Sequence, residues 1–387
     1  MSKGDLMRLP GKYVNFFILL VGLAGCTPEN PQESHGTGAV RVGQVLGGSE
    51  DDDHFDRAEV VREFVFPKDH GTHPTYRTEW WYLTANLLSD KGEEFGVQYT
   101  LFRHALSPSP LGASKWQSGQ VFMAHIALTD VDRGIHRHDQ RLSRGHQGMA
   151  GVTIVPSFKA FLEDWVLEGD VEDQVKLSLK ASSGSRFGMD LELMQTQPFL
   201  YQGDQGLSAK GPGQASYYYS IPSMSVSGEV MMDSRVSRVT GKAWLDREWS
   251  TSVLNDAQQG WDWFSLHFDD DSEVTLFNLR RIDCSQDRFN QALRLSADGE
   301  RHDYDAREFT IRPLEFWVDS TGTSWPVRWS LEFPGEAFEL KALVNDQIMD
   351  TGIRYWEGVI GVYQDSKRLG SGYMELTGYE GEPQCSE

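Results

Sequence analysis

Short runs in which apolar and polar residues alternate fill the chain from about residue 60 to 380. Examples are GQVFMAHIALTD (119–130), VKLSLKA (175–181), EVTLFNLR (273–280) and VRWSLEF (327–333). Alternation with a period of two is typical of β-strands with one buried face, and the Gly, Asp, Asn and Ser between the runs indicate turns. A helical period is almost absent. The pattern therefore predicts an all-β fold, either a sandwich or a barrel.

Two hairpin-like segments of this pattern are similar to each other. EWWYLTANLLSDKGEEFGVQYTLFR (79–103) and GWDWFSLHFDDDSEVTLFNLR (260–280) each contain an aromatic strand, a turn and a second strand that ends in arginine. An alignment of the two segments pairs Trp81-Tyr82 with Trp263-Phe264, and Arg103 with Arg280.

The ends of the two halves also match. GKAWLDREW (241–249) resembles SGYMELTGY (371–379), with Trp244-Leu245-Asp246 matched to Tyr373-Met374-Glu375. Two matches in the same order predict an internal duplication. We expect two consecutive β-barrel units, divided at the turn-rich segment 255–259.

The first 26 residues have a different character. They have a basic start, an apolar run from Val14 to Ala24, and small residues before Cys26. The apolar run is too short to span a bilayer comfortably, so it predicts a secretory signal. Leu23-Ala24-Gly25-Cys26 resembles a bacterial lipobox, whose cysteine is acylated and becomes the mature N-terminus; a plain cleaved signal is the alternative. Thr27, rather than an aspartate, favours the outer over the inner membrane.

The chain therefore divides into four predicted parts. A lipoprotein signal covers residues 1–26, and residues 27–56, which are poor in aromatics and rich in Gly, Pro, Ser and Asp, form a flexible tether. The N-terminal barrel unit covers 57–254 and the C-terminal unit 255–387. The expected location is the periplasmic side of the cell envelope, with a membrane contact through the lipid anchor.

Composition excludes several classes of function. The net charge is −21 over 387 residues, and no basic run follows the first 15 residues, which argues against nucleic acid as a partner. The chain has no phosphate-binding glycine loop, no G-x-S-x-G, no H-E-x-x-H and no C-x-x-C. We therefore expect no cofactor and no metal. Cys284 and Cys385 are compatible with a disulfide or with free thiols.

The stretch TEWWYLTANL places a carboxylate next to aromatic residues. Alternation puts Glu79 and Trp81 on one face of the strand, and Trp80 and Tyr82 on the other. A carboxylate in an apolar interior is costly unless it is paired, and Arg103 at the end of the next strand is the natural partner. Either the pair is a structural salt bridge, or Glu79 and Trp81 line a lipophilic cavity while Trp80 and Tyr82 belong to the core.

AWLDREWS places a second carboxylate beside tryptophans. Alternation puts Trp244, Asp246 and Glu248 on one face and Arg247 on the other. Loss of solvent raises the pKa of a carboxyl toward the range in which it can donate a proton near neutral pH. Asp246 is therefore a candidate general acid, and a hydrogen-bond acceptor at a strand end is the alternative.

QASYYYSIP places Tyr217 and Tyr219 on one face, where their hydroxyls either orient a substrate or only pack. With EWWYL, LFRHAL, MAHIAL, YQGDQGLSAKG, AWLDREWS, GWDWFSL and GYMELTGY, this stretch resembles the AttH/carotenoid 1,2-hydratase (CrtC) family over nearly all of residues 60–380. The resemblance implies a pair of lipocalin-like β-barrels. It also implies activities that include carotenoid hydration, under labels that include "predicted secreted hydrolase".

The family resemblance also implies roles for particular residues. In the carotenoid hydratases a Tyr-x-Asp strand supplies the acid that protonates a double bond, and water captures the cation. This acid corresponds to Asp246, with Trp244 in place of the tyrosine. A His-x-Trp pair of those enzymes falls on Tyr217 and Tyr219, so both residues differ, which argues against a carotenoid substrate. The lipobox fits the AttH-type envelope lipoproteins that are associated with ABC-type exporters.

Two functions follow as hypotheses. The first is a hydratase- or hydrolase-type enzyme that acts on a hydrophobic small molecule or lipid, with Asp246 as general acid. Its predicted binding residues are Tyr217, Tyr219, Trp244, Glu79, Trp81 and Arg103. The alternative is a carrier that binds the same kind of ligand without changing it, or an accessory protein of an ABC-type transporter.

Overall fold

The computed structural model describes residues 54–108, 119–252 and 254–380. All of them belong to a single compact unit. The predicted signal, Cys26 and nearly all of the predicted tether lie outside the described residues. No helix in the described part of the chain is long and apolar enough to cross a membrane. Cys284 is disulfide-bonded, and the two other cysteines of the sequence lie outside the described residues.

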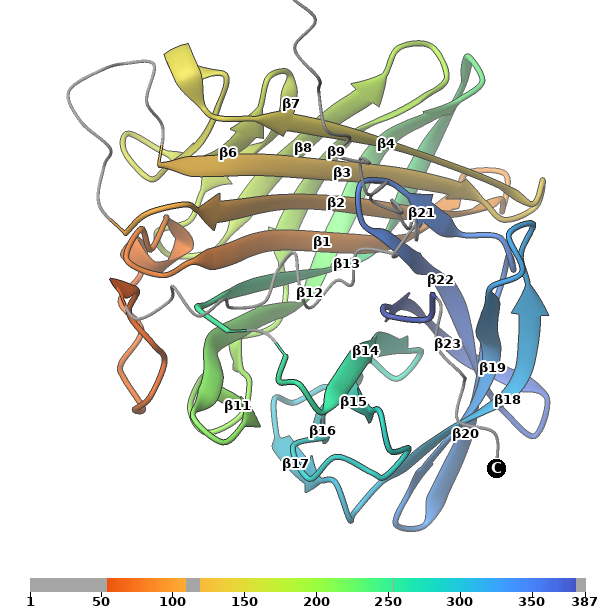
Figure 1. Cartoon of the computed structure of the whole chain (residues 1–387). Coiled ribbons are helices and arrows are strands. Elements are labelled where there is room, and N and C mark those ends of the chain that lie inside the picture. The colour runs from red at the N-terminus through yellow and green to blue at the C-terminus, as the bar shows by residue number, and fades with distance from the viewer. Residues whose placement is uncertain (1–53, 109–118, 253, 381–387) are drawn as a thin grey trace, which may run out of the picture. The chain divides into compact units, whose positions relative to one another are not determined.

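The structure is built from β-strands, with two short 3-10 helices, η2 (Lys68–His70) and η3 (His146–Gly148), and no α-helix within the described ranges (Figure 1). The strands form two antiparallel sheets. The first sheet contains β1 (Thr78–Ser89), β2 (Glu94–Ala105), β3 (Gln120–Asp130), β4 (Ile135–Ser143), β5 (Ala150–Thr153), β6 (Phe158–Leu162), β7 (Trp165–Asp170), β8 (Lys176–Ser183), β9 (Phe187–Gln195), β10 (Leu200–Tyr201), β11 (Leu207–Gly211), β12 (Gln214–Met232) and β13 (Arg235–Ser250).

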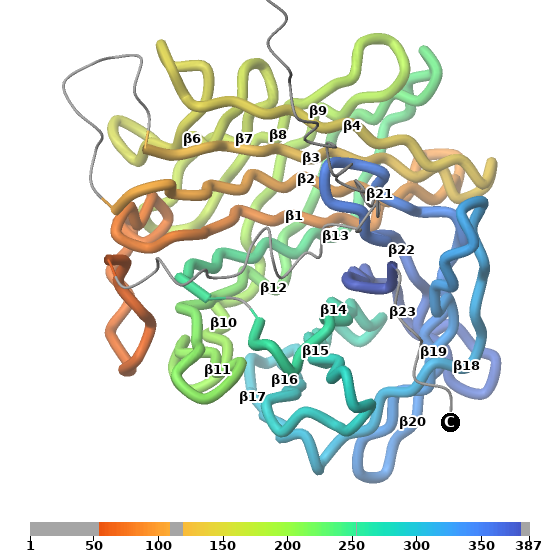
Figure 2. The backbone as a smooth tube through the Cα atoms, viewed as in Figure 1, coloured from red at the N-terminus to blue at the C-terminus, as the bar shows by residue number. Residues whose placement is uncertain are grey.

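The second sheet uses the rest of the chain. It contains β14 (Gln258–Phe268), β15 (Glu273–Arg281), β16 (Gln291–Leu295), β17 (Arg301–Asp305), β18 (Thr310–Val318), β19 (Ser324–Phe333), β20 (Glu336–Ala342), β21 (Ile348–Asp350), β22 (Arg354–Gln364) and β23 (Lys367–Leu376). Figure 2 shows the chain leaving the first sheet after β13 and entering the second at β14.

The first sheet nearly closes on itself. Its order is β4-β3-β2-β1-β13-β12-β9-β8-β7-β6-β5, with β10 and β11 paired to β12. β6, near one end of this order, also lies against β2, β3 and β4, so the sheet curls into a nearly closed barrel. The second sheet has the order β17-β16-β15-β14-β23-β22-β20-β19-β18, with β21 paired to β22. The predicted all-β fold of two consecutive antiparallel units is confirmed.

Each sheet encloses its own apolar core. Trp81, Tyr99 and Trp165 are buried in the first core, and Trp325 and Trp356 in the second. Each fully buried large apolar side chain contributes on the order of 1.5–3 kcal/mol. Strands that face solvent on one side, such as β8, alternate between buried and exposed residues. This alternation is what the sequence pattern predicts.

A third apolar cluster lies between the two sheets. It includes Tyr82 and Trp244 from the first sheet and Trp263, Phe277 and Tyr373 from the second. β1 contacts β23, and β2 contacts β22. β1 and the second half of β13 are therefore buried on both faces, because the first core covers one face and the second sheet the other.

The strand registers show how the two units correspond. β1 pairs with β2 and β13, and β14 pairs with β15 and β23. In the first unit the register joins Glu79 to Arg103 and Tyr82 to Asp246. In the second unit it joins Gly260 to Arg280 and Trp263 to Glu375.

These registers make Tyr82 equivalent to Trp263 and Asp246 equivalent to Glu375. The expected correspondence of Asp246 with Glu375 therefore agrees with the strand pairing, as does that of the two arginines. The alignment of Trp81 with Trp263 is wrong by one residue: the register places Trp81 on Asp262. A shift of one residue exchanges the two faces of a strand, so the correction changes which residues point toward the other sheet.

Candidate functional site

A cavity lies where the two sheets meet, on the side of β1, β2 and β13 that points away from the first core. It has about 860 Å³ of space free of protein atoms, part of it open to solvent, and about 80 Å³ of this is wide enough for the centre of a water molecule. The site is therefore narrow. The residues that line it are Trp80, Tyr82, Thr100, Phe102, His125, Lys210, Tyr218, Asp246, Glu248, Leu254, Trp261, Trp263, Phe277, Leu279, Ile353, Tyr355, Glu375 and Thr377.

Asp246 on β13 is held at this cavity by hydrogen-bond donors. Its Oδ1 accepts hydrogen bonds from Ser220 Oγ at 2.5 Å and from Trp244 Nε1 at 2.7 Å. Its Oδ2 accepts one from the hydroxyl of Tyr218 at 2.6 Å, which itself accepts one from Trp263 Nε1 at 3.1 Å. The side chain is 2% exposed. The carboxyl is therefore buried but fully hydrogen-bonded, as a buried polar group needs to be.

Burial dominates the ionisation of Asp246. Loss of solvent raises its pKa to about 7, against the lowering effect of the hydrogen bonds from Ser220, Tyr218 and Trp244, and the charge of Glu248 raises it further. A carboxyl with this pKa is present in both protonation states near neutral pH. Asp246 can therefore donate a proton to a bound molecule, and its donors stabilise the carboxylate that remains.

A second carboxyl, Glu375 on β23, lines the same cavity. Its Oε1 accepts a hydrogen bond from Trp261 Nε1 at 2.7 Å. Protein surrounds Glu375, which is partly exposed within the cavity. Burial raises its pKa to about 7, and the charges of Asp246 and Glu248 raise it too. The two carboxyls therefore influence each other across one cavity.

Many residues of the cavity wall occupy equivalent positions in the two duplicated units. By strand register, seven of the ten lining residues from the first unit have a counterpart among the lining residues of the second. The equivalent pairs are Trp80 and Trp261, Tyr82 and Trp263, Thr100 and Phe277, Phe102 and Leu279, Tyr218 and Tyr355, Asp246 and Glu375, and Glu248 and Thr377. The cavity is thus a pseudo-symmetric junction of two similar surfaces.

An ion pair lies at the Glu248 side of the cavity. Lys210 Nζ is 2.9 Å from Glu248 Oε1, and it lies 4.8 Å from the ring centre of Phe277 and 5.3 Å from that of Tyr218. Lys210 is the only basic residue among Lys and Arg that lines the cavity within the described residues. Because carboxyls outnumber it, the site favours neutral or electron-poor groups over anions.

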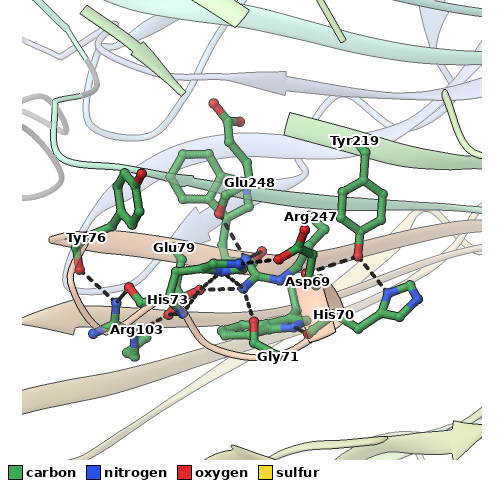
Figure 3. A network of polar contacts seen from close by, with 12 residues as sticks. Asp69, His70, Gly71, His73, Tyr76, Glu79, Arg103, Tyr219, Arg247 and Glu248 are labelled. Carbon is green, nitrogen blue, oxygen red and sulfur yellow. Dashed lines mark hydrogen bonds and ion pairs between the residues drawn. The ribbon is translucent and has the colours of Figure 1, made fainter. Parts of the chain in front are cut away.

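Glu79 and Arg103 form a separate network on the opposite face of the strands (Figure 3). Arg103 and Arg247 both form ion pairs with the Glu79 carboxylate. The backbone N–H of His73 donates to both Glu79 oxygens, at 3.0 and 3.1 Å. Burial alone would raise the pKa of Glu79, but Arg103, Arg247 and His73 lower it well below its ordinary value.

This network fixes the loop around η2 to the sheet. Arg247 also donates to the carbonyl of Gly71, and Arg103 donates to the carbonyls of His73 at 2.9 Å and Tyr76 at 2.8 Å. Both carboxylate oxygens of Glu79 therefore have partners within the protein. Of the two interpretations of Glu79, the contacts support the structural salt bridge.

The remaining predicted binding residues lie on the same face as Glu79. Trp81 belongs to the first core and donates to the carbonyl of His70 at 2.8 Å. Tyr217 donates to the carbonyl of Val60 at 2.8 Å, and the hydroxyl of Tyr219 is 2.6 Å from His70 Nδ1. The expected faces are thus exchanged: Glu79, Trp81, Arg103, Tyr217 and Tyr219 do not line the cavity.

Of the predicted residues, only Asp246 lines the cavity. Trp244 is fully buried and contacts the site through its hydrogen bond to Asp246. The residues that sequence reasoning missed include Tyr218, between the two predicted tyrosines, and Tyr82, directly opposite Asp246 in the register. Residues of a neighbouring strand that share a face with Asp246 lie an even number of positions from the residue paired with it. The sequence alone could not identify these residues, because it does not show how the strands pair.

The described residues contain no group of three or more His, Cys, Asp or Glu side chains arranged to hold a metal ion. The chemistry that the cavity offers is proton transfer by the carboxyls of Asp246 and Glu375 between aromatic walls. Together, the fold and the cavity define a two-unit, lipocalin-like β-protein with a carboxyl-bearing apolar site.

The comparisons with known proteins identify the family. The family model described as AttH-like matches residues 57–379, and the chain belongs to this family. The crystal structure of an AttH protein from Nitrosomonas europaea is 32% identical, with a TM-score of 0.75, and the match covers 84% of this chain and 100% of that chain. The resemblance stated from the sequence is confirmed. No curated protein matches the chain.

Two more distant structures share the fold. Kievitone hydratase from Nectria haematococca is 14% identical, with a TM-score of 0.61, over 87% of this chain and 98% of that chain. The structure of CghA with Sch210972 is 15% identical, with a TM-score of 0.51, over 86% of this chain and 97% of that chain. At these identities the likeness is one of fold.

Proposed function

We propose that this protein is a hydratase- or hydrolase-type enzyme for an apolar substrate, with Asp246 as the proton donor. The observation that carries the proposal is a buried carboxyl with a pKa of about 7 on the wall of an apolar cavity. A carboxyl of this kind can protonate a weakly basic atom that water does not protonate near neutral pH. Because a protein of similar fold is a hydratase, we propose that the reaction is the addition of water.

The cavity residues support the steps of such a reaction. Asp246 transfers its proton to one carbon of an isolated double bond, which leaves a cation on the neighbouring carbon. The faces of Trp80, Trp261 and Phe277 can stabilise that cation by cation–π interaction. Ser220, Tyr218 and Trp244 stabilise the Asp246 carboxylate. A water molecule then adds to the cation and loses a proton.

We also propose where the enzyme acts. The sequence before the first barrel supports a lipid anchor at Cys26 and a location on the periplasmic side of the envelope, in the outer membrane rather than the inner. This location would give the cavity access to apolar molecules of the envelope, and an ABC-type transporter is the proposed partner. Labelling of the chain with a radioactive fatty acid, lost on Cys26→Ser, tests the anchor.

The catalytic proposal is tested with the purified full chain in D₂O. The probe is an organic-solvent extract of the host's cell envelope, and mass spectrometry follows new products. The expected product carries one deuterium on carbon and an added hydroxyl, and Asp246→Asn lowers its rate by about 10²–10⁴-fold. A molecule bound and released unchanged by both proteins would contradict the enzyme and favour the carrier.

A further inference from the structure

Two glutamates lie directly opposite each other beside the cavity. Glu357 on β22 is the register partner of Glu375 on β23. Directly opposed residues of antiparallel strands point to the same face, with Cβ atoms about 4.5–5.5 Å apart. Glu375 lines the cavity, whereas Glu357 is 0% exposed and does not. One carboxyl therefore faces the substrate space and the other lies behind it.

The oxygens of Glu357 have no hydrogen-bond partner among the residues that the structure describes. Neither of its carboxyl oxygens accepts a hydrogen bond, and the hydroxyls of Tyr82 and Tyr373 beside it also have none among the described residues. The hydroxyls of Tyr82 and Tyr355 are close enough to influence the ionisation of Glu357, but they do not reach it in hydrogen-bond geometry. An ionised carboxylate in this position would be very costly. Glu357 is therefore expected to carry a proton.

None of the described groups that act on the pair is positively charged. The groups that act on Glu357 are Glu375, Tyr82 and Tyr355, and burial and the charge of Glu375 raise its pKa well above the ordinary value. The groups that act on Glu375 are Trp261, Asp246 and Glu248. His125, which is 2.7 Å from the Tyr355 hydroxyl, is neutral at physiological pH because burial lowers its pKa to about 3. Two such carboxyls cannot both ionise.

We propose that Glu375 and Glu357 form a second proton-transfer site of the cavity: the pair shares one proton, and Glu375 accepts the proton of the water that adds to the substrate. The proposal rests on the proposed hydratase function. Glu375 is the catalytic base, since it reaches the cavity, and Glu357 is a positioning residue that holds the shared proton behind it.

The proton balance closes over one turnover. The O–H bond of Asp246 breaks as a C–H bond forms on the substrate, and the neighbouring carbon forms a C–O bond with water. That water loses one proton to the Glu375 carboxylate. The Glu375–Glu357 pair then holds two protons and Asp246 none. Transfer of one proton back through water in the cavity restores the starting state, and neither oxidant nor reductant is needed.

The first test measures ionisation without substrate. Infrared spectra of the full chain are recorded against pH for wild type, Glu357→Gln, Glu375→Gln and the exposed control Glu192→Gln. In wild type and in the control we expect the protonated-carboxyl band of the pair to persist above neutral pH. Glu357→Gln should remove the part of this band that persists above neutral pH, because it takes away the carboxyl that keeps the proton of the pair. A band that persists unchanged above neutral pH in Glu357→Gln would overturn the shared proton.

The second test measures turnover with the envelope extract in D₂O. Glu375→Gln should form the deuterated product at least about tenfold more slowly, with an intact fold by circular dichroism. Glu357→Gln should keep turnover but move the acid limb of its pH profile upward, because the shared proton no longer stabilises the Glu375 carboxylate. Normal turnover in Glu375→Gln, with an active wild type, would overturn the base and leave the proposed function standing. An inactive wild type would refute the proposed function, while the infrared titration would still decide the shared proton.

Discussion

The two carboxyls of the cavity occupy equivalent positions in the two units, yet their surroundings differ. Asp246 receives hydrogen bonds from Tyr218, Ser220 and Trp244, so its charge is stabilised once it forms. Strand register makes Tyr355, Glu357 and Tyr373 the counterparts of these donors at Glu375. The strand arrangement is therefore repeated in the second unit, but the hydrogen-bond donors to the carboxyl are not.

Each replacement removes a donor from Glu375. The hydroxyl of Tyr355 lies 2.7 Å from His125 Nδ1, a second carboxyl, Glu357, stands in place of the serine, and the hydroxyl of Tyr373 has no partner within the described residues. In the proposed reaction the first carboxyl gives up a proton and its donors stabilise the charge that remains, whereas the second shares a proton with the carboxyl beside it. On this proposal, one duplicated strand arrangement supplies both an acid and a base.

The largest expected effect tests whether Asp246 acts through its acidic proton or only through its structural contacts. Asp246→Asn should lower turnover of the envelope extract by about 10²–10⁴-fold, because the amide has no acidic proton to give. Asp246→Glu should retain part of the activity, since the acid remains although its position shifts. Product formation is followed by mass spectrometry. Equal loss in both variants, with both proteins folded, would indicate a structural rather than an acidic role.

The next prediction concerns the face of β1 and β13 that points away from the cavity, where we expect a change in stability rather than in activity. Glu79→Gln should lower the free energy of unfolding by about 3–5 kcal/mol, because it leaves Arg103 and Arg247 buried without their counter-charge. Urea unfolding measures the change, and the exposed Glu192→Gln should behave as wild type. Loss of activity at unchanged stability would contradict the structural assignment of Glu79.

The pH dependence of stability sharpens the comparison. The pKa of Asp246 is raised from 3.8 to about 7 on folding, so the folded state keeps a proton that the unfolded chain loses. Its contribution is complete below about pH 4 and is lost as the pH rises to about 7, an effect of about 4 kcal/mol. Asp246→Asn should therefore give a flatter curve of unfolding free energy against pH. A slope equal to that of wild type would show that Asp246 ionises normally.

The smallest effect compares two equivalent aromatic residues. Trp244→Phe removes a donor to Asp246 and should lower the free energy of unfolding by about 1 kcal/mol or more. It should also raise the pKa of Asp246. Tyr373→Phe removes a hydroxyl without a partner and should be neutral or stabilising. Thermal unfolding of the two variants measures both changes in stability. A larger loss of stability in Tyr373→Phe than in Trp244→Phe would mean that the Tyr373 hydroxyl has a partner such as ordered water.

Much of the architecture could be predicted from the sequence. Period-two alternation identified strands and separated their two faces, and the order of similar segments predicted the repeat that the registers of β1 and β14 show. The shared face of Trp244 and Asp246 also followed from alternation, and the structure joins them by a hydrogen bond of 2.7 Å. Alternation depends only on residues close together in the chain, and a repeat is found by comparing two segments without knowing how they pack.

The direction of the faces could not be predicted. Alternation correctly separated Glu79 and Trp81 from Trp80 and Tyr82, but the first pair was expected at the cavity and the second pair lines it. The reason is that β1 is buried on both sides. In a strand with one solvent-exposed face, polar residues show which face points outward. A strand that lies between a core and a second sheet is apolar on both faces, so its sequence does not show which face is which.

The sequence by itself therefore determined the strand content, the repeat, the family and the carboxyl that shares a face with Trp244. Only the tertiary structure decided which face meets the second sheet, and that Tyr218 rather than its neighbours reaches Asp246. It also brought Glu357 and Glu375 together beside Asp246. Contacts between strands more than a hundred residues apart depend on register and sheet packing, and no local pattern encodes either of them.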